Sequence, residues 1–345
     1  MRQTLTLALA AVLLVFGLSA CQQGDTEELV IYSGRSKALV DSLVQVYRQQ
    51  TDQQVSVRYG SDAQLLAALE EEGDQSPADV FWANTTGALG QANNADLLAT
   101  LPDTLLERPI NFAPSSGSWT PVTARFRVLA YNPDNVDPDD LPASVLDLPD
   151  LDQFEGRIGW TPAYSSFQDF ITAMRTLHGP DTTMTWLEGM QALNPNSYTS
   201  NTPMIRALAA GEIDIALTNH YYVLRLKYGD AKVEDESTVD PQAPVATYHF
   251  EAGDVGNLAL VTGAGQLNTS DQPAEAQQFL RFLLSEQAQQ FAVTQVNEYP
   301  VVEGVQVPEY LMSVEDALQL SPTFDFEQLR ELDATLQLLR EAGAL

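Results

Sequence analysis

Two adjacent tyrosines, Tyr221 and Tyr222, follow a run of residues that predicts a buried strand. The run GEIDIALT covers residues 211–218, and the polar pair Asn219 and His220 separates it from the tyrosines. A phenolate oxygen is a hard ligand, and a trivalent cation can hold it deprotonated far below its usual pKa of roughly 10. Adjacent side chains of a regular strand point to opposite faces of the sheet. Both phenols can therefore bind one ion only if the strand ends before them, in a turn or at a helix start; otherwise they pack at a strand end.

Sequence signatures of catalysis are scarce in this chain. It has no Walker phosphate-binding loop, no G-x-S-x-G motif and no H-E-x-x-H motif. Its histidines, His178, His220 and His249, lack the spacing of a zinc site. We therefore expect a binding protein and not an enzyme. A secreted enzyme or adhesion module is the alternative class, and a broad turnover screen would detect the enzyme.

The elements that must position these residues alternate along the first part of the chain. Strands are predicted at residues 29–34, 54–60 and 78–83, and helices at residues 36–51 and 62–73. This order favours a mostly parallel sheet covered by helices. Ligands of such sheets bind beyond the carboxyl ends of the strands, so we expect the loops after the first and third strands to contribute to a site.

A second α/β unit is predicted at about residues 125–248, around a stretch rich in Pro and Asp. It contains a strand candidate at residues 157–162 and a helix candidate at residues 165–177. Further along, the amphipathic pattern predicts one helix over residues 271–293 and another over residues 324–345.

The start of the chain predicts export. Residues 1–20 contain one Arg near the start and then an apolar run, which is typical of a secretory signal. The signal ends LSAC at Cys21, which resembles a bacterial lipobox, so we expect lipidation of Cys21 and a polar linker over residues 21–26. An ordinary signal cleaved nearby, with Cys21 incidental, is the alternative. Cys21 is the only cysteine, so we expect a fold without disulfides that a lipid tethers but does not embed.

The composition is strongly acidic, with 47 acidic residues against 17 basic ones and a formal net charge of −30. Such a surface repels nucleic acids and anionic lipids, so we expect no nucleic-acid partner. An acid-rich, lysine-poor exported protein is typical of salty surroundings, where self-repulsion is screened, and this explanation is favoured over a direct role in ligand binding.

Several stretches, in chain order, resemble the ferric-ion-binding solute receptors of bacterial ABC importers, which belong to the two-lobed periplasmic binding protein superfamily. The matching stretches are LVIYSGR at 29–35, ADVFWANTTGAL at 78–89, GRIGWTPAYSSFQDFITAM at 156–174, IDIALTNHYY at 213–222 and NEYPVVEGV at 297–305. The resemblance covers nearly everything from Leu29 to the C-terminus. It implies an α/β fold of the type II periplasmic-binding-protein class, with a hinge between two mixed sheets flanked by helices.

The resemblance also implies a set of metal ligands. The twin tyrosines that bind Fe(III) in this family match Tyr221 and Tyr222, and the third tyrosine of one branch matches Tyr164. Another branch uses a histidine and a glutamate, and at those positions this chain has Ser36 and Asn84. The resemblance therefore implies the tyrosine-rich branch, in which a carbonate-type anion completes the coordination of Fe(III).

Cationic and neutral donors would have to hold that anion. The planar guanidinium of Arg35 matches the geometry of carbonate or a carboxylate, and a surface salt bridge is its alternative role. The residues expected at the anion are Arg35, Ser36, Ser165, Ser166 and Asn219. The residues expected to line the cleft are Tyr32, Asn84 and His220, of which His220 either shapes the turn or adds a fourth protein ligand.

We expect residues 27–122 and 250–303 to form the first lobe, and residues 123–249 and 304–345, with the C-terminal helices, to form the second. The resemblance implies a monomeric, periplasmic or extracytoplasmic lipoprotein that delivers Fe(III) to the permease and ATPase of an ABC transporter. The alternative within the same fold is binding of sulfate, phosphonate, thiamine or a polyamine without metal. Visible absorption distinguishes the two, because only tyrosine-to-iron charge transfer gives colour.

Overall fold

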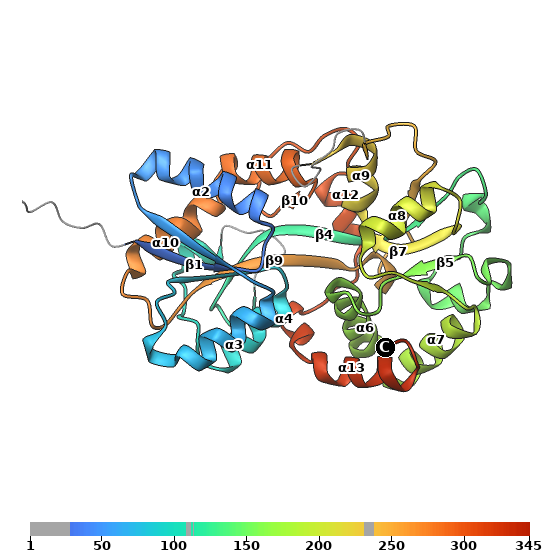
Figure 1. Ribbon diagram of the computed structural model, residues 1–345, viewed down its shortest axis with the longest axis horizontal. Coiled ribbons are helices and arrows are strands. Elements are labelled where there is room, and N and C mark those ends of the chain that lie inside the picture. Colours follow the sequence, from blue (N-terminus) through green and yellow to red (C-terminus); the bar gives the residue numbers. More distant parts are fainter. Residues whose placement is uncertain (1–27, 108–111, 113, 231–237) are drawn as a thin grey trace, which may run out of the picture.

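The computed structural model places two α/β lobes side by side (Figure 1). The residues that it describes are 28–107, 112, 114–230 and 238–345. Three predictions concern residues outside the described ranges: the signal at 1–20, the lipidation site Cys21 and the linker at 21–26. Within the described ranges, every helix is too short or too polar to span a bilayer.

The first lobe is built on parallel strands that alternate with helices. Its elements, in chain order, are β1 (Leu29–Ser33), α2 (Lys37–Thr51), β2 (Val55–Tyr59), α3 (Asp62–Glu72), β3 (Val80–Ala83), α4 (Thr86–Asn94) and the short α5 (Asp103–Leu106). β1 pairs in parallel with both β2 and β3. Helix α2 forms here because its apolar residues recur every three or four positions and make one buried face. The strand–helix order predicted for this region is confirmed.

The second lobe repeats this alternation with shorter strands. Its elements are β5 (Ile158–Trp160), α6 (Ser165–His178), α7 (Pro180–Ala192), β6 (Asn196–Ser197), α8 (Asn201–Ala209), β7 (Ile215–Asn219), α9 (His220–Tyr228) and β8 (Ala246–Tyr248). β5 pairs in parallel with both β6 and β7. As in the first lobe, helices follow buried strands: α6 comes after β5 and α9 after β7.

The long strand β4 (Thr120–Tyr131) connects the two lobes. Its first half pairs antiparallel with β9 (Ala259–Gln266) and β10 (Tyr299–Pro300), and its second half pairs with β7 and β8. Figure 1 shows β4 and β9 running along the molecule between the lobes. The predicted two-lobed α/β fold with mixed sheets is confirmed, and the two sheets are joined through β4.

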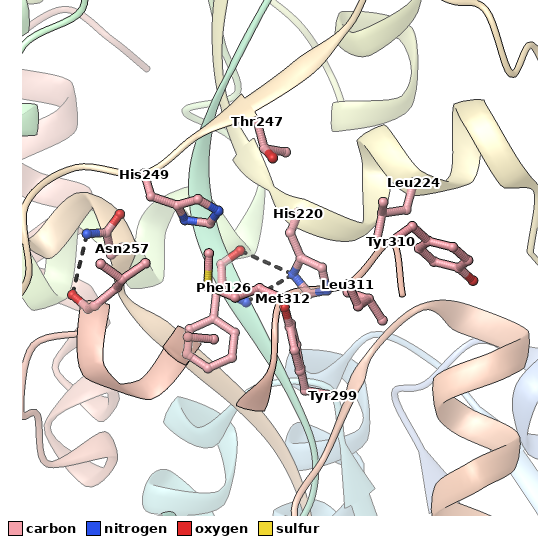
Figure 2. A pocket seen from close by; sticks show the side chains of 12 residues that line it. Phe126, His220, Leu224, Thr247, His249, Asn257, Tyr299, Tyr310, Leu311 and Met312 are labelled. Carbon is pink, nitrogen blue, oxygen red and sulfur yellow. Dashed lines mark hydrogen bonds between the residues drawn. The ribbon is translucent and has the colours of Figure 1, made fainter. Parts of the chain in front are cut away.

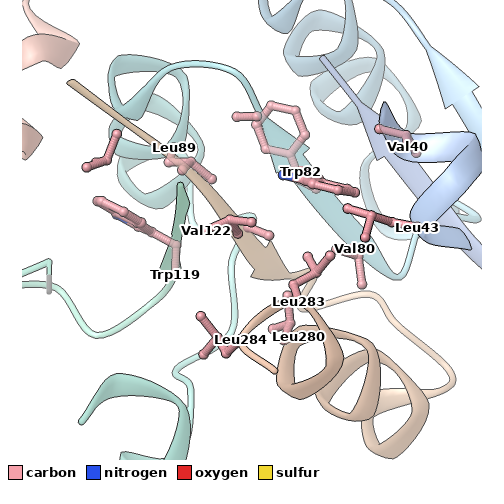
Figure 3. Packing of buried hydrophobic residues seen from close by; sticks show 14 of the residues in the cluster. Val40, Leu43, Val80, Trp82, Leu89, Trp119, Val122, Leu280, Leu283 and Leu284 are labelled. Carbon is pink, nitrogen blue, oxygen red and sulfur yellow. The ribbon is translucent and has the colours of Figure 1, made fainter. Parts of the chain in front are cut away.

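The buried apolar residues form separate cores for the two lobes. In the first lobe, Val40 and Leu43 of α2 and Val80 of β3 pack against Leu280 and Leu283 (Figure 3). Each fully buried side chain of this size stabilises the fold by about 2 kcal/mol. The core of the second lobe begins on β4 at Leu129, directly after the residues that belong to the first core. The exact lobe boundaries of the sequence analysis stay a prediction.

Two helix predictions near the C-terminus are wrong in detail. The amphipathic stretch at 271–293 forms two helices, α10 (Pro273–Leu283) and α11 (Glu286–Val296). They separate at Ser285, whose side chain accepts a hydrogen bond from the backbone N–H of Ala288 and so caps a new helix. Residues 324–345 likewise divide into a 3-10 helix, η7 (Phe326–Arg330), and α13 (Leu332–Glu341). The short α12 (Val314–Leu320) precedes them.

Candidate functional site

The strand that precedes the twin tyrosines ends where the phenols require it to end. β7 stops at Asn219 and α9 begins at His220, so Tyr221 and Tyr222 occupy the first turn of a helix. Neighbouring residues on a helix diverge by about 100°, not the 180° of a strand. The two rings therefore lie on one side, with their centroids 4.4 Å apart. The predicted change from strand to helix start is confirmed.

Tyr164 joins these two residues from a different element. It is the N-cap residue of α6, four residues after the end of β5, and its hydroxyl oxygen lies 3.0 Å from that of Tyr222. Asn219 donates from its side-chain amide to the hydroxyl of Tyr221 over 3.5 Å. Tyr164, Tyr221 and Tyr222 are hereafter called the phenol cluster, and all three belong to the second lobe.

Burial and mutual repulsion oppose ionisation in the phenol cluster. Burial raises the pKa of Tyr164, and the neighbouring charge of Tyr221 raises it further. The pKa of Tyr222 is raised well above its ordinary value by the same two causes in the same order. Tyr164 and Tyr222 are therefore neutral at neutral pH. A bound trivalent cation would reverse this balance, because its charge favours the phenolate form.

Three arginines surround the phenol cluster, and sequence reasoning missed them. Arg125 and Arg127 lie on β4 and are 2% and 1% exposed, whereas Arg225 lies on α9. The guanidinium of Arg225 stacks over the rings of Tyr221 and Tyr222, at 5.3 and 4.8 Å from their centroids. Buried N–H groups of all three, Nε of Arg125, Nη2 of Arg127 and Nη2 of Arg225, have no hydrogen-bond partner among the described residues. The site thus retains donors for a ligand.

A sequence signal for these arginines does exist. Arg125 and Arg127 alternate along the otherwise largely apolar run TARFRVLAY, so both point to the same face of a buried strand. Burial lowers the pKa of Arg127 to about 9, so it stays a cation at neutral pH. Charged residues that alternate inside a buried strand require a buried partner or a ligand.

In the first lobe, an ion pair and an amide side chain form the wall of the site. Arg35, which follows β1, donates from Nη1 to Oδ1 of Asn84 over 2.7 Å and from Nη2 to Oε2 of Glu298 over 2.6 Å. Arg35 is 6% exposed and Glu298 is 2% exposed, so this pair is shielded from water. The Nε of Arg35 has no partner among the described residues. Sequence reasoning missed Glu298 as part of this wall, although it lies within the matching stretch at 297–305.

Four helices that follow strands, α2, α4, α6 and α9, begin without a side-chain cap. Their N-cap residues are Ser36, Thr85, Tyr164 and Asn219. By contrast, the neighbouring α3 has a complete capping box at Ser61. Uncapped helix N-termini offer free backbone N–H groups and a partial positive charge, which together favour anions.

The serines predicted at the anion are distributed around these helix starts. The hydroxyl oxygens of Ser36 and Ser166 are buried and have no partner among the described residues. Ser165 is exposed and lines a cavity of about 300 Å³ between the lobes, together with Asp62 and Asn84 of the first lobe. Asn219 accepts from Nη1 of Arg127 over 3.3 Å, so it connects the arginines to the phenol cluster.

Two carboxyl groups, one half-buried and one buried, line the interlobe cavity. Asp62 accepts hydrogen bonds from the backbone of Asn84 and from the backbone and hydroxyl of Thr85, and burial nevertheless raises its pKa. Asp169 of α6 is 6% exposed, and burial raises its pKa to about 7 against the attraction of Arg125. The charge of Asp62 raises the pKa of Asp169 further, so the two carboxyl groups repel each other across the lobes.

Two of the residues expected in the cleft have other contacts. The hydroxyl of Tyr32 donates to Glu72 over 2.9 Å and accepts from Nη1 of Arg58, so these first-lobe groups occupy it. His220 uses both ring nitrogens on backbone groups, Nε2 with the carbonyl of Asn297 and Nδ1 with Phe126 (Figure 2). Burial lowers the pKa of His220 to about 4. With both nitrogens occupied, the imidazole shapes the helix start and has no lone pair free for a metal.

The donor set therefore consists of phenols. Over the described ranges, no group of three or more His, Cys, Asp or Glu side chains could hold a metal ion. The phenol cluster, with cationic arginines and free backbone donors beside it, can instead hold a hard trivalent cation together with an anion.

The chain resembles known proteins over most of its length. The family model described as "Bacterial extracellular solute-binding protein" matches residues 29–295. The chain is 30% identical to the Fe(3+)-binding periplasmic protein of Serratia marcescens over 338 residues, which is 97% of this chain and 96% of that one.

Solved structures resemble this one closely. The iron-bound structure of HitA from Pseudomonas aeruginosa is 34% identical, with a TM-score of 0.82 over 92% of this chain and 99% of that one. The structure of IdiA (FutA) from Trichodesmium in complex with iron and citrate is 27% identical, with a TM-score of 0.77 over 92% and 99% of the two chains.

Proposed function

The chain belongs to the family of bacterial extracellular solute-binding proteins, and on that premise we propose that it captures Fe(III) outside the cytoplasm and delivers it to an ABC importer. The observation that supports this most directly is the phenol cluster, with the hydroxyl oxygens of Tyr164 and Tyr222 at 3.0 Å. A ligand-free protein gains little from three buried phenols in contact. A trivalent cation uses them, because phenolates neutralise its charge.

Iron capture is a proton exchange in this proposal. Tyr164 and Tyr222 are neutral before iron binds, since burial and the neighbouring phenol raise their pKa values. Each phenol that becomes a ligand releases its proton to solvent. Arg125 and Arg225 lower the cost of the resulting phenolates, because their charges lie close to Tyr164.

A carbonate-type anion completes the coordination in this proposal. Arg35 is its principal cation, and Ser36, Ser165, Ser166 and Asn219 add hydrogen bonds. The free Nε of Arg35 and the unpartnered hydroxyls of Ser36 and Ser166 support this role. The uncapped N-termini of α2 and α6 support it as well, because they favour negative charge. A small carboxylate such as citrate presents the same chemistry to these donors.

Delivery requires that the lobes open and close about β4. Arg35 and Glu298 belong to the first lobe and the phenol cluster to the second, so a complex of iron and anion contacts both lobes and stabilises the closed arrangement. We expect the protein to act as a monomer. Lipidated Cys21 would anchor it to the membrane beside the permease and its ATPase.

The test is a visible absorption titration of the mature protein with Fe(III), with and without bicarbonate. A charge-transfer band that appears with iron, and weakens in both Tyr221→Phe and Tyr164→Phe, is the expected result. A colourless protein that gains thermal stability from an oxyanion alone would instead assign it to the anion receptors of the same fold.

A further inference from the structure

A second cavity lies on the other side of α9 from the phenol cluster. It has a volume of about 280 Å³ and is lined by Phe126 of β4, His220 and Leu224 of α9, and His249. Residues from the C-terminal segment, among them Met312, close it. Figure 2 shows the rings of His249 and His220 directed toward this common space, with Phe126 beside them. No site residue of the proposed iron function other than His220 lines it.

The lining defines the chemistry of an occupant. Among the described residues that line the cavity, none is Asp, Glu, Lys or Arg, so a charged ligand would find no ionic partner in the lining. Aromatic rings of Phe126, His220, Tyr299 and Tyr310 surround the space, and rings pack favourably edge to face. A cavity of about 150 Å³ holds benzene, so this larger volume accommodates a molecule with two fused rings.

One polar group in the cavity lacks a partner. The imidazole of His249 forms no hydrogen bond with any described residue, although burial lowers its pKa and keeps it neutral. A neutral imidazole can donate from one nitrogen and accept at the other. By contrast, the nitrogens of His220 are both occupied by backbone groups. His249 is therefore the group that would orient a ligand.

The walls of the cavity connect to both ends of α9. At the start of α9, Nε2 of His220 donates to the carbonyl of Asn297 over 2.8 Å. At its end, the side-chain amide of Asn297 donates to the carbonyl of Gly229 over 3.1 Å. The hydroxyl of Tyr310 donates to Oδ1 of Asn297 over 3.0 Å. A molecule that contacts Tyr310 and His220 thus stabilises the position of the helix that begins with the twin tyrosines.

We propose that this cavity is a second ligand site, for a neutral two-ring aromatic molecule with one hydrogen-bonding group, and that its occupation strengthens binding at the phenol cluster. Only the coupling to the phenol cluster rests on the proposed iron function. Because coupling between two sites is reciprocal, iron and the aromatic ligand would raise each other's affinity by the same factor.

Indole is the probe for the binding half, titrated calorimetrically into the iron-free mature protein. We expect saturable binding that Ala317→Phe abolishes, because this substitution fills the cavity from a residue that is 4% exposed. His249→Phe keeps the ring and removes the hydrogen-bonding group, so it should weaken binding by about fivefold to tenfold. Thr323→Phe is the matched control, since Thr323 is exposed in a different cavity and should leave binding unchanged. Circular dichroism melting verifies that each variant is folded.

Absence of indole binding to the wild-type protein, or equal binding to folded Ala317→Phe, would overturn the site. For the coupling half, Fe(III) is titrated with and without saturating indole, and at least a fivefold gain in iron affinity is expected. Unchanged iron affinity with indole bound would overturn the coupling. Because the indole titration uses iron-free protein, failure of the iron proposal would leave its outcome unaffected.

Discussion

The two walls of the cleft differ in how their buried cations are paired. In the first lobe, Glu298 neutralises Arg35 at 2.6 Å, although Nε of Arg35 has no partner among the described residues. Around the phenol cluster, Asp230 pairs with Arg225 at 2.5 Å, whereas Arg125 and Arg127 form no ion pair within the described residues. The first wall is therefore balanced in charge without a ligand, whereas the second keeps two unpaired cations beside three phenols.

In the proposed function, this difference gives the two lobes different roles. The phenol cluster of the second lobe would hold the metal, and the anion would have to compete with Glu298 for Arg35 in the first lobe. Metal affinity should therefore depend on the second lobe far more than on the first. Four changes test this comparison.

Acidification should have the largest effect, because it acts on more than one phenol at once. The pKa values of Tyr164 and Tyr222 are raised, so these two phenols are protonated throughout the range below neutrality and each must lose a proton to bind iron. The iron affinity should fall as the pH falls, by about tenfold per pH unit for each phenol ligand. Competition with a chelator at several pH values measures the slope. A slope near zero would contradict phenolate binding.

Removing one phenol should have the next largest effect. Tyr222→Phe keeps the ring, which packs at 4.4 Å from Tyr221, and deletes only the ligand oxygen. Loss of a group that merely orients a metal ligand costs about 10- to 100-fold in affinity, so loss of the ligand itself should cost more. Visible titration measures both affinity and charge-transfer intensity. Tyr228→Phe, at a tyrosine that is 50% exposed, is the control and should behave as wild type.

Substitutions in the first-lobe wall should change anion dependence in opposite directions. Arg35→Gln removes the cation, so bicarbonate should strengthen iron binding about tenfold less than in the wild type. Glu298→Gln removes the competing carboxylate, so the effect of bicarbonate should increase. Titrations with and without bicarbonate measure both. Lys37→Gln is the control, because exposed Lys37 pairs with Asp41 and lies over the ring of Tyr59. A similar loss of the bicarbonate effect in all three variants would contradict the difference between the two walls.

The smallest effect concerns stability. Burial raises the pKa of Asp169 from 3.8 to about 7, so the folded state binds this proton more tightly than the unfolded state. The contribution of Asp169 to stability is therefore complete below pH 4 and is lost as the pH rises to about 7. Asp169→Asn should raise Tm relative to wild type by an amount that grows between pH 4 and 7 and then stays constant. Thermal unfolding of iron-free protein measures it, with exposed Asp181→Asn as control. A rise in Tm that does not change with pH would contradict the raised pKa of Asp169.

Local sequence pattern was sufficient for much of the fold. Apolar spacing in α2 and the run before Asn219 predicted a buried helix face and a strand end, because periodicity depends only on residues close together in the chain. It failed at Ser285, where a cap divides one apolar stripe into two helices without interrupting the periodicity.

Local sequence pattern also predicted part of the phenol cluster. The adjacency of Tyr221 and Tyr222 and the strand end before them were evident from neighbouring residues. The contact of Tyr164 with Tyr222, across 58 positions of the chain, required either the family resemblance or the tertiary structure.

The alternating elements, the acidic composition with a single cysteine, and the pair of phenols at a helix start were all evident from composition or from residues close together in the chain. The pairing of Glu298 with Arg35, 263 positions away, and the position of Arg125 and Arg127 of β4 beside the phenols became evident only in the folded protein. Periodicity reports only which face of an element is buried. Which charges meet on that face depends on how distant elements pack, and this packing leaves no local pattern.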